Sequence, residues 1–302
     1  MTDPAAAVLA TSSTFSWNPV ADWQALTAHA FMRDALLAGT IAAVVSAVIG
    51  YFVVLRGLVF AADALTHIGF TGASGAVLLG LNPIAGLLAL TISSAVGIGA
   101  LQQRLRGRDV VTGMILVEAL GLGVLFLRLS SGYSNQTYAL LFGDILALSV
   151  QNLVVLAVAG AAALLATAAI FRPLLFASLD EEVAEARGVP VRALAIGFVV
   201  VVAIAVVAAT QVIGALLAVV LIVAPAATAQ RLTHRPLLGI GLAVAIALLV
   251  TWTGIALAFW LPYPVSFFIT SLGAIAWLAV WVPTSRRLGA PARHAAHAHA
   301  AA

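Results

Sequence analysis

The chain has 302 residues, of which 63% are hydrophobic and 8% are charged, and its mean hydropathy is +1.15. Soluble domains carry roughly 25% charged residues, so this composition excludes an ordinary water-soluble fold and predicts an all-α polytopic membrane protein. Cysteine is absent and all 14 basic residues are arginine, which excludes disulfides, thiolate metal ligands and the phosphate-binding lysine of a P-loop.

The hydrophobic residues gather in nine segments joined by short connections. A spanning helix needs about 20 mostly apolar residues, and we predict about eight or nine transmembrane helices in one membrane domain at 31–283. The segments are 34–55, 61–80, 83–102, 110–128, 149–171, 193–210, 213–230, 238–260 and 265–282.

Arginines follow every second segment, beginning with the first. They share one side of the membrane if every segment crosses, and positive residues mark the cytoplasm. The pattern predicts an extracellular N-terminus with an interfacial segment at 1–30, and a cytoplasmic C-terminus. It also explains the pI of about 9.9 without a nucleic-acid partner. The arginines that follow the alternate segments are Arg56, Arg104, Arg106, Arg108, Arg172, Arg231, Arg235, Arg286 and Arg287.

Two ionisable residues lie four positions apart in the second segment. Asp63 and His67 occur in the run FAADALTHIGFTG, and on a helix their side chains point the same way, about one turn apart. A carboxylate and an imidazole in this arrangement can bind Zn²⁺, Mn²⁺ or Fe²⁺, with further ligands from other helices, water or a second subunit. The alternative is a buried ion pair, or side chains that cap backbone groups near the cytoplasmic end.

The fourth segment and the stretch after it hold three more charged residues. Glu118 and Arg128 are ten residues apart, nearly three helical turns, so we expect them not to pair directly. Residues 130–147 begin polar, and their apolar part is too short to cross a bilayer. This stretch, which holds Asp144, predicts a partly inserted or surface helix on the outer side.

An acidic stretch, ASLDEEVAEARGVPVR, separates the fifth and sixth segments. Ser178 or Asp180 is a candidate N-cap, and Gly188 with Pro190 is a stop signal, so we predict a cytoplasmic helix at about 178–190. In the seventh segment, Pro225 removes a backbone donor and predicts a helix bend, which could serve a gate.

The tail at 284–302 is rich in alanine and is predicted to be disordered. Its three closely spaced histidines could hold a metal weakly, which slightly favours zinc as the metal that the protein handles. They are His294, His297 and His299.

Five stretches in order resemble the permease subunits of the zinc, manganese and iron ABC importer family, over about residues 31–282. The chain departs from that family at Thr66, at 70–72 and at 262–264, which leaves open the local geometry of the second helix and of the last outer turn. The matching stretches are FMRDALLAG, GYFVVLRGLVFAADALTHIGFTG, YALLFGDILALS, EEVAEARGVPVRAL and VIGALLAVVLIVAPAATAQRL.

The resemblance implies a large-bundle (type II) ABC importer fold and a transporter subunit that is not itself an enzyme, in the plasma membrane of a bacterium. Two permease copies would stand on two cytoplasmic ATPase subunits, which hydrolyse ATP, and would receive the ion from an extracellular metal-binding protein. It implies no permanently bound cofactor, and Zn²⁺, Mn²⁺ or Fe²⁺ as the transported ion.

The resemblance also assigns roles to particular residues. Asp63 and His67 would contact the ion in the pathway, and the acidic helix would dock into the ATPase through Asp180, Glu181, Glu182, Glu185, Arg187 and Gly188. The alternative function is a self-sufficient secondary carrier of metal ions, coupled to protons through Asp63, His67 and Glu118. Uptake by the purified chain alone would favour that alternative.

Overall fold

The computed structural model describes residues 24, 27–101, 108–130, 141, 143 and 145–288. Several sequence predictions lie outside the described residues: most of the interfacial segment at 1–30, Asp144 with most of the stretch before it, and the three histidines of the tail, His294, His297 and His299.

Each of the nine predicted segments forms a helix, and no strand occurs within the described ranges. The helices are α3 (Ala30–Leu55), α4 (Val59–Leu78), α5 (Pro83–Leu101), α6 (Arg108–Leu129), α8 (Val150–Ala169), α11 (Val191–Ile213), α12 (Ala218–Leu232), α13 (Pro236–Trp260) and α14 (Val265–Leu288). Three short elements lie between them: the 3-10 helix η1 (Ile145–Ala147), α9 (Phe171–Leu179) and α10 (Glu181–Ala186).

By length and composition, seven of the described helices can cross a membrane: α3, α5, α6, α8, α11, α13 and α14. The other two predicted segments are α4, which has 20 residues, and α12, which has 15. The all-α, multi-pass architecture predicted from the sequence is therefore confirmed. The predicted number of transmembrane helices, about eight or nine, agrees approximately with the seven candidate spans and the two further segments.

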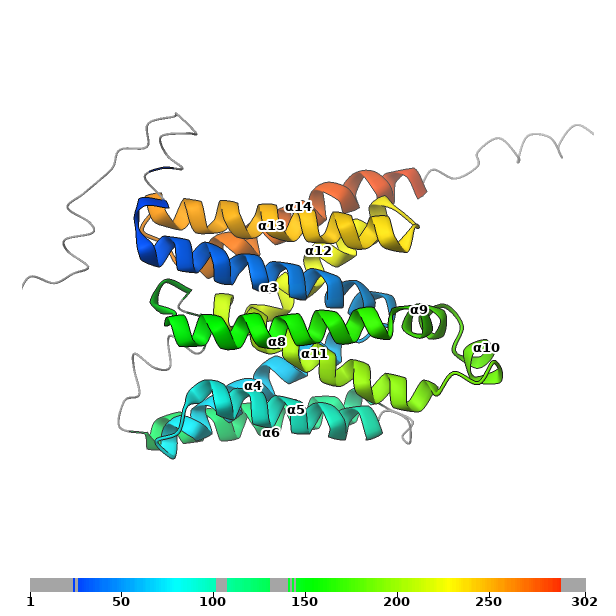
Figure 1. The fold of residues 1–302 in the computed structure, drawn as a ribbon, viewed down its shortest axis with the longest axis horizontal. Helices are drawn as coiled ribbons and strands as arrows, with labels where there is room; N and C mark the ends of the chain where they lie inside the picture. The colour runs from blue at the N-terminus through cyan, green and yellow to red at the C-terminus, as the bar shows by residue number, and fades with distance from the viewer. Residues whose placement is uncertain are drawn as a thin grey trace, which may run out of the picture.

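The long helices lie roughly along one axis in three groups (Figure 1). Helices α4, α5 and α6 pack together on one side, and α12, α13 and α14 pack together on the other. Between them, α3 and α11 form the centre of the bundle, because 67% of each span is buried, compared with 22% for α6, α8 and α14. The groups meet closely where glycine faces backbone: a Cβ at Gly50 of α3 would overlap the carbonyl of Ile222 in α12.

The seventh helix begins later than the sequence predicted. The predicted segment starts at 213, but α12 starts at Ala218, because Gly214 has φ +81° and a turn follows it. Gly143 packs against this turn, and the Leu216 N–H donates to the Leu141 carbonyl at 3.2 Å. The apolar composition of 214–217 hides this turn from a hydropathy analysis.

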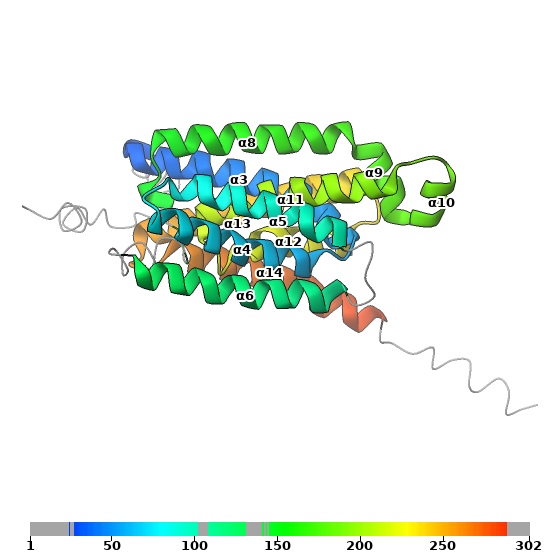
Figure 2. The ribbon, with the colours of Figure 1, turned by 90° about the horizontal axis from the view of Figure 1, so that it is seen from below.

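The cytoplasmic helix predicted at 178–190 is also different in the structure. It is two helices, α9 and α10, separated by Asp180, which is the C-cap of one and the N-cap of the other. Figure 2 shows α10 beyond the ends of the long helices and α9 beside those ends, at the same end as in Figure 1. The break arises because the Asp180 carboxylate accepts a hydrogen bond from the Val183 N–H at 2.9 Å, which caps α10 and interrupts the preceding helix.

Candidate functional site

Asp63 and His67 lie on one face of α4, as their spacing predicted. His67 Nε2 is 3.8 Å from Asp63 Oδ1, and their side chains are 13% and 35% exposed, respectively. His67 Nδ1 is buried and has no hydrogen-bond partner. A buried ring nitrogen without a partner is costly, and this nitrogen is not the Nε2 that lies near Asp63.

The separation of the two donors suits one divalent ion. Nitrogen and oxygen ligands lie about 2.0 to 2.2 Å from zinc, so two ligands of one ion are at most about 4.3 Å apart, and about 3.4 Å apart at the tetrahedral angle. The observed 3.8 Å falls between these limits. Among the described residues, no group of three or more His, Cys, Asp or Glu side chains could hold a metal. Two donors are fewer than the four ligands of a typical zinc site, so a metal bound here would need further ligands.

The rest of α4 is continuous through the positions where the chain departs from the family pattern. Thr66 donates to the Asp63 carbonyl at 2.7 Å and Thr71 donates to the His67 carbonyl at 3.2 Å, so both hydroxyls are satisfied within the helix. Gly72 allows close packing, because a Cβ there would overlap the Gly86 carbonyl of α5. The helix bearing the pair is thus held by backbone contacts, without a proline turn.

A second helix brings another carboxylate to a similar depth. The Thr71 hydroxyl also donates to the Ala119 carbonyl of α6, which places Glu118 beside this level of α4. Glu118 is exposed on α6 and does not join Asp63 and His67 in a cluster.

The acidic segment presents its charges to solvent. Glu181, Glu182 and Glu185 are exposed on α10, whereas Ala184 is fully buried beneath them. The helix ends in a Schellman arrangement: the Val189 N–H donates to the Ala184 carbonyl at 3.0 Å, and Gly188, at φ +83°, follows Arg187. The predicted N-cap Asp180 and stop residue Gly188 are confirmed. The acidic residues are therefore presented on a helix that is capped at both ends, and its docking role stays a prediction.

Pro225 lies inside α12 and is buried. Its ring removes the N–H that would bond the Leu221 carbonyl. Because α12 packs against α3, α13 and α14, this weak point lies within the bundle. The sequence-based hypothesis of a gate at Pro225 stays untested.

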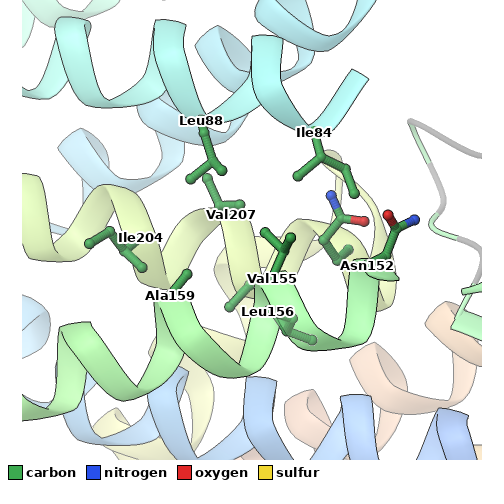
Figure 3. Close-up of a pocket in the computed structure, with 10 residues that line it drawn as sticks. Ile84, Leu88, Asn152, Val155, Leu156, Ala159, Ile204 and Val207 are labelled. Carbon is green, nitrogen blue, oxygen red and sulfur yellow. The ribbon is translucent and has the colours of Figure 1, made fainter. Parts of the chain in front are cut away.

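One feature that the sequence did not indicate is a small apolar crevice between α5, α8 and α11. In Figure 3, Leu88 of α5 lies over Val207 of α11, and Asn152 of α8 lies at one end of the crevice. Gln211 is the other amide in the lining, which includes no charged side chain. The crevice therefore offers no carboxylate or imidazole to a transition metal, and its lining does not include Asp63 or His67.

Comparisons with known proteins place these features in a family context. The model of the ABC 3 transport family matches residues 28–283. Over 211 residues the chain is 30% identical to the "Manganese transport system membrane protein MntC" of Halalkalibacterium halodurans, covering 70% of this chain and 72% of the relative. Over 226 residues it is 27% identical to the "High-affinity zinc uptake system membrane protein ZnuB" of Haemophilus influenzae, covering 74% and 86%.

A solved structure is similar over most of the chain. It is described as "PsaBC from Streptococcus pneumoniae in complex with Fab", and it superimposes with a TM-score of 0.80 at 25% identity. The similarity covers 89% of this chain and 98% of the other.

Proposed function

Because this chain belongs to the ABC 3 transport family, we propose that it is the membrane permease subunit of an ATP-driven importer for a divalent transition metal, zinc or manganese. The observation that carries this proposal is the Asp63 and His67 pair, whose donors are 3.8 Å apart on a helix inside the bundle. Asp63 and His67 lie in the first half of α4, and ionisable side chains within helices of a membrane domain usually mark an ion pathway or a functional partner.

The incomplete coordination sphere supports a pathway formed by two copies of the chain. A two-fold symmetric dimer repeats every surface group, so a second copy could supply another carboxylate and imidazole. Two donors from one chain, completed by water or by the other copy, would bind an ion weakly enough to release it. Transport requires this property, since an ion held by a full set of ligands would not leave.

ATP hydrolysis belongs on another subunit in this proposal. The chain has no lysine and hence no P-loop, so it needs a partner to use ATP. The exposed acidic face of α10, held beyond the ends of the long helices, is the surface that we assign to this ATPase. Its side would then be cytoplasmic, with the N-terminus outside, and an extracellular binding protein would deliver the metal.

The decisive experiment is metal uptake into proteoliposomes that contain the permease with its ATPase and binding protein. Asp63→Ala and His67→Ala should each abolish uptake of Zn²⁺ and Mn²⁺ while leaving the complex assembled. The matched control is His234→Ala, because His234 is exposed beyond the end of α12. Near-normal uptake by both site variants would refute the assignment of the pair, and ATP-independent uptake by the chain alone would refute the importer.

A further inference from the structure

Arg56 lies at the end of α3, where α9 contacts α3, two residues before the last residue that precedes α4. It is the C-cap of α3, and it is half-buried. Its Nη1 donates to the Ser178 hydroxyl oxygen of α9 at 3.4 Å, across 122 positions of sequence. The Ser178 hydroxyl itself donates to the Leu174 carbonyl at 2.5 Å, which leaves its lone pairs available to the guanidinium.

Charge reinforces this contact. Burial lowers the pKa of Arg56, and the negative charge of Glu181, the first residue of α10, opposes that effect. An arginine stays protonated at any physiological pH, so Arg56 holds a permanent positive charge beside the acidic helix. Arg56 is therefore attracted to Glu181 of α10 in addition to its hydrogen bond with Ser178 of α9.

A second contact joins the same two elements one turn earlier in α3. The rings of Phe52 and Phe171 pack edge to face with centroids 5.7 Å apart. Phe52 is fully buried, as is Leu174 on the next turn of α9. The C-terminal turn of α3 and the α9–α10 segment are therefore held together by an apolar contact and a polar one.

Arg56 is also close to the start of α4. Only Gly57, at φ +66°, and Leu58 separate Arg56 from the first residue of α4, Val59. The connection is tight, because the Leu58 N–H donates back to the Val53 carbonyl at 2.8 Å and the Leu58 carbonyl accepts from Ala62 at 2.9 Å.

The metal pair lies a short distance along α4 from this connection. At 1.5 Å per residue, Asp63 lies about 6 Å and His67 about 12 Å along α4 from its first residue. No long loop separates the connection from the pair, so a small displacement of the connection also moves Asp63 and His67.

We propose that Arg56 is a positioning residue that transmits movement of the α9–α10 segment to α4, and so couples the ATPase-docking surface to Asp63 and His67. This inference rests on the proposed function. When the acidic helix moves with the ATPase, the Arg56 to Ser178 hydrogen bond and the attraction to Glu181 draw the end of α3 and the start of α4 with it. Without Arg56, ATP hydrolysis continues but moves the pair less.

The test is the number of ions taken up per ATP hydrolysed by the complete complex in proteoliposomes. Arg56→Ala should keep ATP hydrolysis within about twofold of the unmutated complex and should lower uptake per ATP by about tenfold or more, as expected for a hydrogen bond to a charged group. Ser178→Ala removes only the acceptor and should lower the ratio by about two- to fivefold. The matched control is Arg235→Ala, which removes an exposed arginine at the start of α13, at the same end of the bundle, and should leave the ratio unchanged.

The ratio separates coupling from a structural role, because a merely destabilised complex would be less abundant but would still move the normal number of ions per ATP. An unchanged ratio in Arg56→Ala would overturn the inference while leaving the proposed function intact. If Arg56→Ala does not assemble, Ser178→Ala decides by the same criterion. No uptake by the unmutated complex with Zn²⁺ or Mn²⁺ would refute the proposed function, and the inference with it.

Discussion

Substitutions at Asp180 can separate the two roles that one carboxylate has in the acidic helix. Its Oδ1 accepts from the Val183 N–H at 2.9 Å, and it also adds a charge to the exposed face with Glu181 and Glu182. Replacing an N-cap aspartate by alanine costs about 0.5 to 2 kcal/mol, whereas asparagine caps about as well. Because α10 has only six residues, a loss of about 1 kcal/mol should raise the population of its open state about fivefold.

Asp180→Ala should therefore speed amide hydrogen exchange at Val183 and Ala184 by about fivefold, and Asp180→Asn should leave it within about twofold. If the helix docks by shape, Asp180→Asn should also bind the ATPase normally in a pull-down from detergent. Loss of binding in Asp180→Asn with unchanged exchange would assign the docking to charge instead. Equal exchange rates in the alanine and asparagine variants would refute the capping argument, because only one of them retains an acceptor for the Val183 N–H.

Three further predictions concern packing, orientation and selectivity. Gly50→Ala should lower the stability of the detergent-solubilised protein by about 1 to 3 kcal/mol, because its Cβ would overlap the Ile222 carbonyl, and thermal unfolding measures this change. The control is Gly241→Ala, whose Cβ would meet nothing within 4 Å and which should be neutral or stabilising. Since the chain has no native cysteine, a membrane-impermeant thiol reagent should label Leu81→Cys but not His234→Cys in intact cells, and the reverse would invert the proposed orientation. Excess Mg²⁺ or Ca²⁺ should not compete with Mn²⁺ or Zn²⁺ for uptake, because an imidazole ligand disfavours these hard ions; effective competition by either would contradict a role for His67 as a ligand.

Hydropathy was sufficient to locate the helices, because every span in lipid must satisfy its own backbone hydrogen bonds. Hydropathy could not show which of these helices lie at the centre of the bundle. An apolar residue in lipid is as stable facing the bilayer as facing another helix, so the composition of α3 and α11 does not announce their central place. The late start of α12 was missed for a similar reason, since residues 214–217 are apolar although they form a turn.

Local spacing was informative where the interaction is local. Asp63 and His67 are four residues apart on one helix, and Asp180 caps the helix that directly follows it, so both were predicted. The Arg56 to Ser178 contact joins residues 122 positions apart, and the sequence showed Arg56 only as one of several positive residues at helix ends. Which arginine points inward depends on the fold of the whole bundle.

The polar side chains of α4 make the strongest physical case for the site. A polar group inside a membrane domain must find a partner, and Thr66, Thr71 and Ser74 each find one in a backbone carbonyl. Asp63 and His67 face each other at 3.8 Å, beyond hydrogen-bond range, and His67 Nδ1 is buried without a partner. If the polarity of α4 served only to hold helices together, these two side chains would be as well satisfied as their neighbours. Asp63 Oδ1 and His67 Nε2 are thus polar atoms of this helix that no backbone group engages, and their chemistry suits a divalent cation that visits and leaves.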